Sequence, residues 1–410
     1  MTGVAVRGVG PNQLLPPSTY FEPEWYEREQ AELFSRTWRY VGPADEFGKP
    51  GSYRSVQVGR HPLVVVRGHD GSLRAFHNVC RHRGAAVLPG DGRVEKNIVC
   101  PFHNWTYGLD GCLLAVTQRN EIGKQLDRSK LSLHRASLGV WRGLVFVHPD
   151  PDAQPLVEWL GELPEHLAPY GDITRLVEPV AGARHDVKCN WKVFVEGALD
   201  NYHLGYVHAE NLASMDHKRQ EQRACAPRHW FFYEPPKVPG QLPPEETKGG
   251  LRPLFEDPRW YGSSYGLIFP NLFVLTGATY WASAEIVPTG PETTSFELRA
   301  RIAPGNSAKY LLAGMRELLG QTASRAKRAA VDVATSVRAG DRDSASLLAA
   351  LRKGKKLTVA EEDVFCAESV QRGLRSPKYS VGPIAHRYEH GIQDFQRNVM
   401  AYVPLEGPAA

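Results

Sequence analysis

The sequence has 410 residues, a hydrophobic content of 42% and a formal net charge of +4. One hydrophobic core rarely serves a chain of this length, so we expect two domains. The small net charge gives no reason to expect binding to nucleic acid or a membrane, and the apolar runs are too short to span a bilayer. Six scattered cysteines form no disulfide framework and the N-terminus lacks the apolar stretch of a signal peptide, which together predict a cytoplasmic protein.

The predicted elements change character along the chain. Residues 16–38 indicate a short helix after a Pro-rich lead, and 50–149 hold short strand-like runs between turns, as in a small all-β domain. A Pro- and Asp-rich stretch at 149–155 is the predicted linker. Beyond it, helices and strands mix as in an α+β domain. Strands are predicted at 271–275, 280–288 and 294–302, and helices at 190–203, 307–330 and 358–374.

Two cysteines and two histidines are paired in an unusual way on two predicted loops. Cys80 and His82 form Cys-x-His, and Cys100 and His103 form Cys-x-x-His. A Rieske-type [2Fe–2S] cluster needs two thiolates on one iron and two imidazoles on the other, and two such loops supply that set. Structural zinc is the alternative. Zinc sites usually show a Cys-x2–4-Cys knuckle or a helical His pair, and neither is present in this stretch.

A helix with ionisable side chains is predicted to begin at Trp191, because Asn190 is a favourable N-cap. Three ionisable residues then fall on one face, at spacings i, i+4 and i+7: Glu196, Asp200 and His203. Acids and an imidazole among apolar neighbours are costly to bury unless they bind something.

A second imidazole, His208, lies five residues beyond His203. The two rings converge only if the helix breaks, and we expect the break near Gly205. Two histidines and one carboxylate form the facial triad of non-haem Fe(II) oxygenases, which leaves positions open for O2 and substrate. The carboxylate has to come from another part of the chain.

The candidate carboxylate is Asp363. Thr358 and Glu361 form a capping box that begins a helix, and Asp363 interrupts an apolar stripe of that helix. A buried Asp needs a cationic partner; a metal qualifies, and Arg372 or Arg375 is the alternative. The stripe consists of Val359, Cys366, Val370 and Leu374, and the acids expected largely off it are Glu361, Glu362 and Glu368.

The segments "CRHRGA", "CPFHNWTYGLDG" and "NWKVFVEGALDNYHLGYVH" closely resemble the catalytic (alpha) subunits of Rieske non-haem iron oxygenases. In its general sequence character, the C-terminal part is most similar to the choline, betaine and carnitine oxygenase branch. The resemblance implies an α+β fold with an all-β Rieske [2Fe–2S] domain at 40–152. A helix-grip catalytic domain, an antiparallel sheet around a long helix, would take 1–39 and 153–410.

The same resemblance implies a role for each site residue. Asp200 would bridge the Rieske centre of one subunit to the mononuclear iron of its neighbour in a homotrimer. The implied [2Fe–2S] ligands are Cys80, His82, Cys100 and His103, and the implied ligands of the mononuclear Fe(II) are His203, His208 and Asp363.

The implied protein is an oxidoreductase. It would use O2 and electrons from a separate NAD(P)H-linked reductase, directly or through a ferredoxin, to hydroxylate or oxidatively demethylate a small organic molecule. The chain itself shows no nicotinamide-binding fingerprint. Aromatic ring cis-dihydroxylation by a dioxygenase is the alternative within the class, and a Rieske electron-transfer protein without oxygenase chemistry is the alternative outside it.

Three further stretches bear on substrate and partners. Residues 260–281 are rich in aromatic side chains, which suit a quaternary ammonium group or a flat ring, although core packing explains most of them. Residues 234–250 are predicted to form a surface loop, with a substrate lid as the alternative. The basic run 352–356 is predicted to be a solvated loop, with docking of an acidic electron donor as the alternative.

Overall fold

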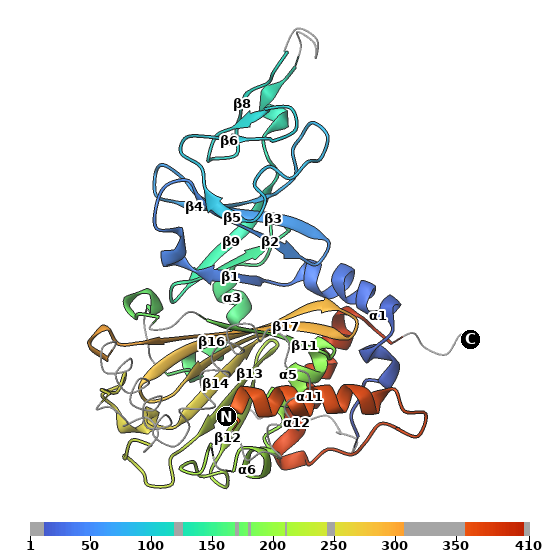
Figure 1. Ribbon diagram of the computed structural model, residues 1–410, viewed down its shortest axis with the longest axis vertical. Coiled ribbons are helices and arrows are strands. Elements are labelled where there is room, and N and C mark those ends of the chain that lie inside the picture. Colours follow the sequence, from blue (N-terminus) through green and yellow to red (C-terminus); the bar gives the residue numbers. More distant parts are fainter. Residues whose placement is uncertain are drawn as a thin grey trace, which may run out of the picture. The chain divides into compact units, whose positions relative to one another are not determined.

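A computed structural model describes residues 12–118, 126–168, 172–178, 182–209, 211–243, 251–306 and 357–405. The chain forms two compact units (Figure 1). The first, called here the β unit, comprises Glu27–Gly161 and Tyr170–Arg175. The second, called the α+β unit, comprises Met1–Tyr26, Glu162–Pro169 and Leu176–Ala410. The predicted domain spans differ from these units at their ends, and the predicted linker at 149–155 lies inside the β unit.

The β unit contains a seven-stranded and a three-stranded sheet, both antiparallel. Every residue from Leu63 to Val66, in one of the inner strands, is 0% exposed, because a hydrophobic core lies on each face of the large sheet. In spatial order the large sheet consists of β1 (Arg39–Pro43), β10 (Leu144–His148), β9 (Arg135–Trp141), β4 (Leu73–His77), β3 (His61–Arg67), β2 (Ser52–Val58) and β5 (Asp91–Arg93). The small sheet consists of β6 (Ile98–Val99), β7 (Thr106–Tyr107) and β8 (Leu113–Ala115).

The short helix predicted within 16–38 is present as consecutive helical pieces over residues 23–36, after a separate turn at 17–20. Pro23 begins a new helix there, and proline has no N–H to continue the preceding turn. The short helices up to residue 175 are η1 (Pro17–Tyr20), α1 (Pro23–Arg28), η2 (Glu29–Leu33), η3 (Phe34–Arg36), η4 (Ala44–Phe47), η5 (Arg128–Leu131), α3 (Leu156–Leu160), α4 (Leu163–His166) and η6 (Ile173–Arg175).

The α+β unit is built on a second seven-stranded antiparallel sheet. Its last six strands follow one another as a meander, and the first strand of the unit pairs with the last. In spatial order they are β11 (Ala183–Val187), β17 (Thr293–Ile302), β16 (Tyr280–Gly290), β15 (Leu272–Thr276), β14 (Ser263–Ile268), β13 (His229–Glu234) and β12 (Glu221–Cys225).

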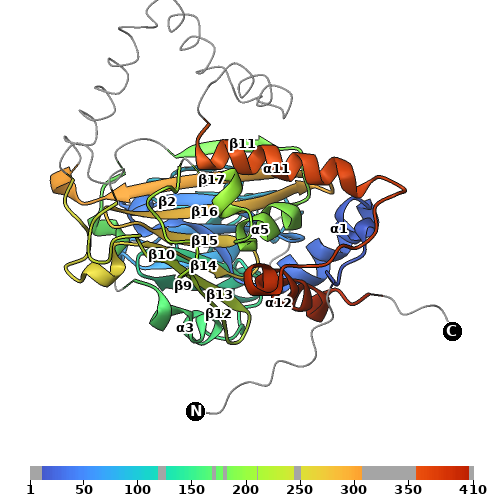
Figure 2. The ribbon, with the colours of Figure 1, turned by 90° about the horizontal axis from the view of Figure 1, so that it is seen from below.

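Helices gather against this second sheet (Figures 1 and 2). The Phe194 ring of the first long helix packs on Phe296 of β17 with centroids 4.8 Å apart, and Trp191 packs on Phe395 of the last helix at 5.5 Å. The helical elements are α5 (Trp191–Leu199), α6 (Leu204–Val207), η7 (Pro258–Trp260), η8 (Pro304–Asn306), α11 (Val359–Leu374) and α12 (His386–Tyr402).

The predicted strands at 271–275, 280–288 and 294–302 correspond to β15, β16 and β17. The helix predicted at 307–330, the basic run 352–356 and residues 244–250 of the predicted loop lie outside the described residues. Within the part of the chain that is described, no helix is both long and apolar enough to cross a membrane.

Candidate metal centres

The two loops that hold the predicted cluster ligands close in the same way. The N–H of Gly84 donates to the carbonyl of Cys80, and the N–H of Asn104 donates to the carbonyl of Cys100, each at 3.0 Å. Gly84 and Asn104 have φ values of 77° and 55°, in the left-handed region that glycine and asparagine tolerate best. Each loop therefore turns back just after its Cys/His pair.

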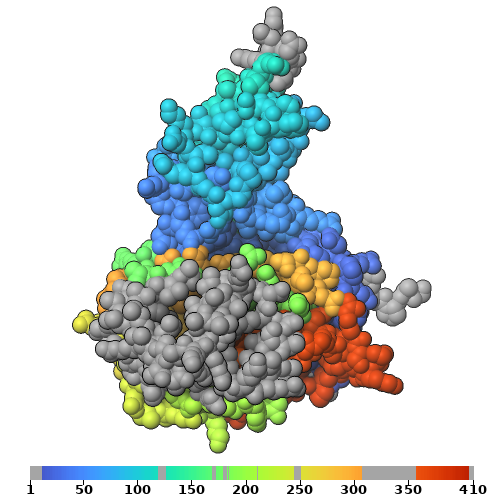
Figure 3. Space-filling view, in the orientation of Figure 1, coloured from blue at the N-terminus to red at the C-terminus, as the bar shows by residue number. Residues whose placement is uncertain are grey.

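The four side chains divide into a buried thiol pair and an outer imidazole pair. Cys80 and Cys100 are 3% and 1% exposed, whereas His82 is exposed and the Nδ1 atoms of His82 and His103 lie 3.2 Å apart. Desolvation, with the neighbouring His82 and Arg83, lowers the pKa of His103 and favours the neutral imidazole that binds iron. This division fits a [2Fe–2S] cluster with two cysteines on one iron and two histidines on the other. The stretch that holds the loops, coloured cyan, reaches the molecular surface (Figure 3).

A buried tyrosine supports the first loop. The N–H of Arg81 donates to the Tyr107 hydroxyl at 3.0 Å, and that hydroxyl lies 3.3 Å from Cys80 Sγ. The His82 ring stacks on Trp105 with centroids 4.9 Å apart. Hydrogen bonds to cluster sulfur ligands help to set a reduction potential, so Tyr107 is a candidate functional residue that the sequence patterns did not indicate.

The helix that leads to the second site ends earlier than predicted. Asn190 caps α5 as expected, but α5 ends at Leu199. Oδ1 of Asp200 there accepts hydrogen bonds from the N–H groups of Tyr202 and His203, at 2.7 and 3.3 Å. A second short helix, α6, follows His203. The chain therefore breaks at 200–203, before the Gly205 position that we expected.

The prediction that Glu196 shares a face with Asp200 and His203 is wrong for this reason. The Glu196 carboxylate instead accepts hydrogen bonds from the Tyr20 hydroxyl at 2.7 Å and from Gln396 Nε2 at 2.9 Å. It belongs to a buried network that joins α5 to the N-terminal segment and to α12.

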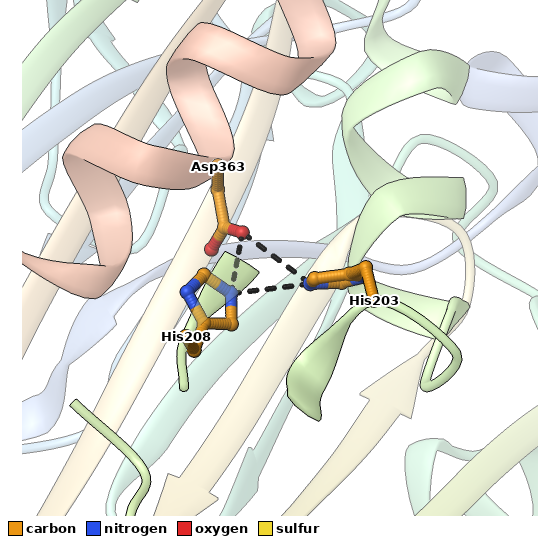
Figure 4. A group of neighbouring side chains, drawn as sticks. All are labelled: His203, His208 and Asp363. Atoms are coloured by element: carbon orange, nitrogen blue, oxygen red, sulfur yellow. Dashed lines mark hydrogen bonds and ion pairs between the residues drawn. The ribbon is translucent and has the colours of Figure 1, made fainter. Parts of the chain in front are cut away.

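Three predicted site residues converge in the structure (Figure 4). The Nε2 atoms of His203 and His208 lie 3.1 Å apart, and Asp363 Oδ1 lies 3.0 Å from His208 Nε2 and 3.7 Å from His203 Nε2. One ligand atom from each residue lies within 4.8 Å of the others, the one such His/Cys/Asp/Glu group found among the described residues. Two imidazoles and one carboxylate fit the facial triad of non-haem iron sites.

Polar contacts determine which face of α11 points at this site. Thr358 and Glu361 form the predicted capping box at its start. Glu368 and Gln371, both buried, accept hydrogen bonds from the N–H groups of Lys188 and Asn190 at 3.1 and 2.9 Å. The predicted apolar stripe is therefore wrong in phase. Val370 is 52% exposed, and the buried residues are Val364, Ala367, Glu368, Gln371 and Leu374.

Each imidazole of the site has a carboxylate at its other nitrogen. Asp200 Oδ2 lies 3.2 Å from His203 Nδ1, and Glu362 Oε2 lies 2.7 Å from His208 Nδ1. Glu362 was expected to lie off the functional face, so its position is a correction. The sequence signal was its place beside Asp363, because adjacent residues on a helix differ by about 100° and can both reach one ring.

These contacts shift the protonation of the three converging groups. Burial alone lowers the pKa of His203, but Asp200 and Asp363 outweigh it and raise the pKa to about 9. Burial also lowers the pKa of His208, but Asp363 and Glu362 outweigh burial, so this pKa is raised as well. Burial would raise the pKa of Asp363, yet the two imidazoles lower it. The carboxylates therefore favour positive charge at this point, which a divalent metal ion supplies.

Tyr265, one of the aromatic residues of 260–281, contacts the segment carrying this site. Its hydroxyl lies 2.7 Å from the Ala198 carbonyl and 2.6 Å from Asn201 Oδ1, and its ring stacks on Phe232 with centroids 4.6 Å apart. Phe269, by contrast, packs in the core against Phe395. Arg375, one of the two alternative partners predicted for Asp363, pairs with Glu292 instead.

Comparisons with known proteins agree with both centres. The family model for the "Rieske [2Fe-2S] domain" matches residues 37–126, and that for the "Ring hydroxylating alpha subunit (catalytic domain)" matches 174–405. The glycine betaine monooxygenase oxygenase subunit of Chromohalobacter salexigens is 28% identical over 390 residues, which cover 93% of this chain and 84% of that protein. Chloroplastic choline monooxygenase of Beta vulgaris is 26% identical over 388 residues, covering 93% and 75%.

A solved structure shows the same fold. The quaternary ammonium Rieske monooxygenase CntA in complex with L-carnitine superposes with a TM-score of 0.68 at 22% identity, over 96% of this chain and 97% of that one. The predicted α+β fold class and both iron cofactors are thereby confirmed, and the zinc and electron-carrier alternatives are not supported. As an oxygenase component, the chain needs electrons from a separate reductase. The chain belongs to the Rieske non-haem iron oxygenases, as the subunit that joins a [2Fe–2S] cluster and a mononuclear iron to oxygenate a small molecule.

Proposed function

We propose that this chain is a monooxygenase that hydroxylates or oxidatively demethylates a small methylated amine. The observation that carries the proposal is the convergence of His203 Nε2, His208 Nε2 and an Asp363 oxygen within 4.8 Å. Two of its full-length relatives are named as glycine betaine and choline monooxygenases. One oxygen atom of O2 would enter a C–H bond, and the other would be reduced to water by two electrons and two protons. Hydroxylation of an N-methyl group releases formaldehyde and leaves N–H.

The site residues divide this work. His203, His208 and Asp363 would hold the mononuclear iron, and the ring nitrogens of His82 and His103 with the thiols of Cys80 and Cys100 would hold the cluster. When bound, the iron supplies the site of O2 activation and the cluster supplies single electrons.

The chain's own side chains prepare the iron ligands. Asp200 accepts from Nδ1–H of His203 and so keeps the lone pair of that ring on Nε2, the atom that faces Asp363. The position of His208, 1% exposed, keeps water from one side of the group. We further propose that Asp200 reaches the Rieske centre of a neighbouring subunit in a homotrimer. The 24% exposure of its side chain is compatible with such a contact.

Aromatic rings on the sheet beside this segment are compatible with either a methylated amine or a flat aromatic ring as substrate. Tyr265 stacks on Phe232, and Phe273 meets Tyr265 edge-on with centroids 5.8 Å apart. Ring faces attract a quaternary ammonium group, whereas stacking surfaces also accept a flat aromatic ring. The test below separates these two substrates.

Partners and location follow from the same proposal. The electron donor is an NAD(P)H-linked reductase, with a ferredoxin between them in a three-component system. The four cysteines that are not proposed cluster ligands are free thiols, which fits a reducing cytoplasm.

The test is a substrate screen with the reduced full-length protein. Methylated amines and aromatic hydrocarbons are supplied with 18O2, and products are read by mass spectrometry. We expect gain of one 18O atom, or loss of a methyl group with formaldehyde, from an amine. Gain of two 18O atoms by an aromatic ring would establish cis-dihydroxylation in its place. An Asp363→Ala variant that makes product as fast as the parent would refute the site.

A further inference from the structure

Glu362 has no assigned part in the reaction, yet it makes the shortest contact to an imidazole of the iron site. Its Oε2 lies 2.7 Å from His208 Nδ1, against 3.2 Å between Asp200 and His203. The Glu362 side chain is 17% exposed and that of His208 is 1% exposed. A charge-assisted hydrogen bond in so enclosed a place is stronger than one at the surface.

The Glu362 carboxylate is itself held in place. Asn211 Nδ2 donates to Glu362 Oε2 at 3.0 Å and lies 3.1 Å from the carbonyl of Leu357. Asn211 thus joins the carboxylate to the backbone just before α11 begins. Glu362 is therefore oriented before any metal binds, which is the condition for a group that positions another.

Two consecutive acids of α11 bracket one imidazole ring. Glu362 meets Nδ1 of His208, and Asp363 Oδ1 lies 3.0 Å from Nε2 of the same ring. If the ring turned by 180° about its Cβ–Cγ bond, carbon atoms would replace both nitrogens at these oxygens. The bracket thus selects one ring orientation. With a metal ion at Nε2, the one proton left on the ring would be on Nδ1, where Glu362 accepts it.

We infer that Glu362 is a positioning residue of the mononuclear iron site, which fixes the ring of His208 so that Nε2 faces the metal. The inference rests on the proposed function, because it takes His208 as an iron ligand. Asp200 also binds two backbone N–H groups, whereas the Glu362 carboxylate contacts the side chains of His208 and Asn211, so its replacement tests ring position more directly.

The experiment measures Fe(II) affinity rather than turnover. Full-length protein with its cluster intact is stripped of mononuclear iron and titrated with Fe(II) against a competing chelator. We expect Glu362→Ala to weaken Fe(II) binding by about 10- to 100-fold, the usual effect of removing such a partner. Glu362→Gln keeps an oxygen that accepts from Nδ1–H and should lose less. Glu361→Gln removes the same charge one residue away and should bind Fe(II) as the parent does.

A second readout reports ligand geometry. Nitric oxide is added to the Fe(II) protein with its cluster oxidised, and the EPR spectrum is recorded. We expect a changed rhombicity in Glu362→Ala and Glu362→Gln but not in Glu361→Gln. If Glu362→Ala does not fold, Glu362→Gln decides the matter by its spectrum and its affinity relative to Glu361→Gln.

Two failures remain distinguishable. Parent-like affinity and spectrum in the Glu362 variants, with Fe(II) binding lost in Asp363→Ala, would overturn the role of Glu362 alone. Parent-like Fe(II) binding in Asp363→Ala as well would overturn the proposed iron site.

Discussion

The two carboxylate oxygens of Asp200 make different contacts, and Asp200→Asn separates them. Oδ1 accepts from the N–H groups of Tyr202 and His203 and ends α5, while Oδ2 faces His203 Nδ1 at 3.2 Å. Asparagine keeps an oxygen for the backbone but places an amino group toward the ring, and an amino group cannot accept from Nδ1–H. The loop should persist while the hydrogen bond to the ring is lost.

The structural cost of this change is bounded. A hydrogen bond to a charged group contributes about 1.5–3 kcal/mol, which equals about 10- to 150-fold in an equilibrium constant. The Asp200 side chain is 24% exposed, so we expect the lower part of that range. With excess Fe(II), Asp200→Asn should carry both metal centres. Turnover should nearly stop, because the proposed connection to the neighbouring cluster is gone.

The assay compares single turnovers of variant and parent at matched iron content. Reduced protein is mixed with substrate and O2, and product and cluster reoxidation are followed together. Asp216→Asn is the matched control, because Asp216 Oδ1 also accepts from a backbone N–H two residues on, that of Lys218 at 3.1 Å, yet it has no contact with His203 among those described. A variant with asparagine at position 200 that reoxidises its cluster and forms product at the parent rate would refute the bridging role.

Three further predictions concern other parts of the molecule. Tyr107→Phe should lower the reduction potential of the cluster in a redox titration, because a hydrogen bond at Cys80 Sγ is lost. Tyr20→Phe should lower the free energy of unfolding by about 1–3 kcal/mol in a denaturant titration, because the buried Glu196 loses a donor. Burial raises the pKa of Cys225 to about 12, so in the folded protein iodoacetamide at pH 8 should alkylate Cys225 much more slowly than the exposed Cys112.

Each of these has a contrary outcome. An unchanged potential in Tyr107→Phe would mean that the hydroxyl does not reach the sulfur. Tyr206→Phe, at a residue 76% exposed, is the control for Tyr20→Phe, and equal effects of the two would refute the buried network. Cys112 is the reference thiol, and alkylation of Cys225 at pH 8 as fast as that of Cys112 would contradict the burial and raised pKa of Cys225.

Features that depend on a few neighbouring residues could be predicted from the sequence. Asn190 caps α5 with its own side chain, and Thr358 and Glu361 cap α11 reciprocally. The cluster loops belong to the same class, since each closes on itself within five residues, from Cys80 to Gly84 and from Cys100 to Asn104. Such hydrogen bonds are made by the local chain whatever the rest of the fold does.

Features that depend on distant residues could not be predicted. The break after Leu199 is supported by the N–H of Asn201, which donates to the carbonyl of Tyr388 in α12 at 3.1 Å. Helical periodicity carries no information about such a partner, so Glu196 was placed on the wrong face. The contact of Glu362 with His208 joins residues 154 positions apart, which local pattern likewise cannot show.

Contacts at the other end of α11 determine whether Asp363 or the adjacent Glu362 faces the imidazoles. A slip of one residue would turn the helix by about 100° and move it by about 1.5 Å, which would bring Glu362 toward the place of Asp363. The same slip would take Glu368 and Gln371 away from two backbone N–H groups, those of Lys188 and Asn190, and would leave buried polar groups unpaired at about 1–3 kcal/mol each. Apolar burial tolerates such a slip far better, because it is not directional. Polar side chains at the buried face of α11 therefore fix its register on the chain that enters α5, and through that register they fix which oxygen reaches His203 and His208.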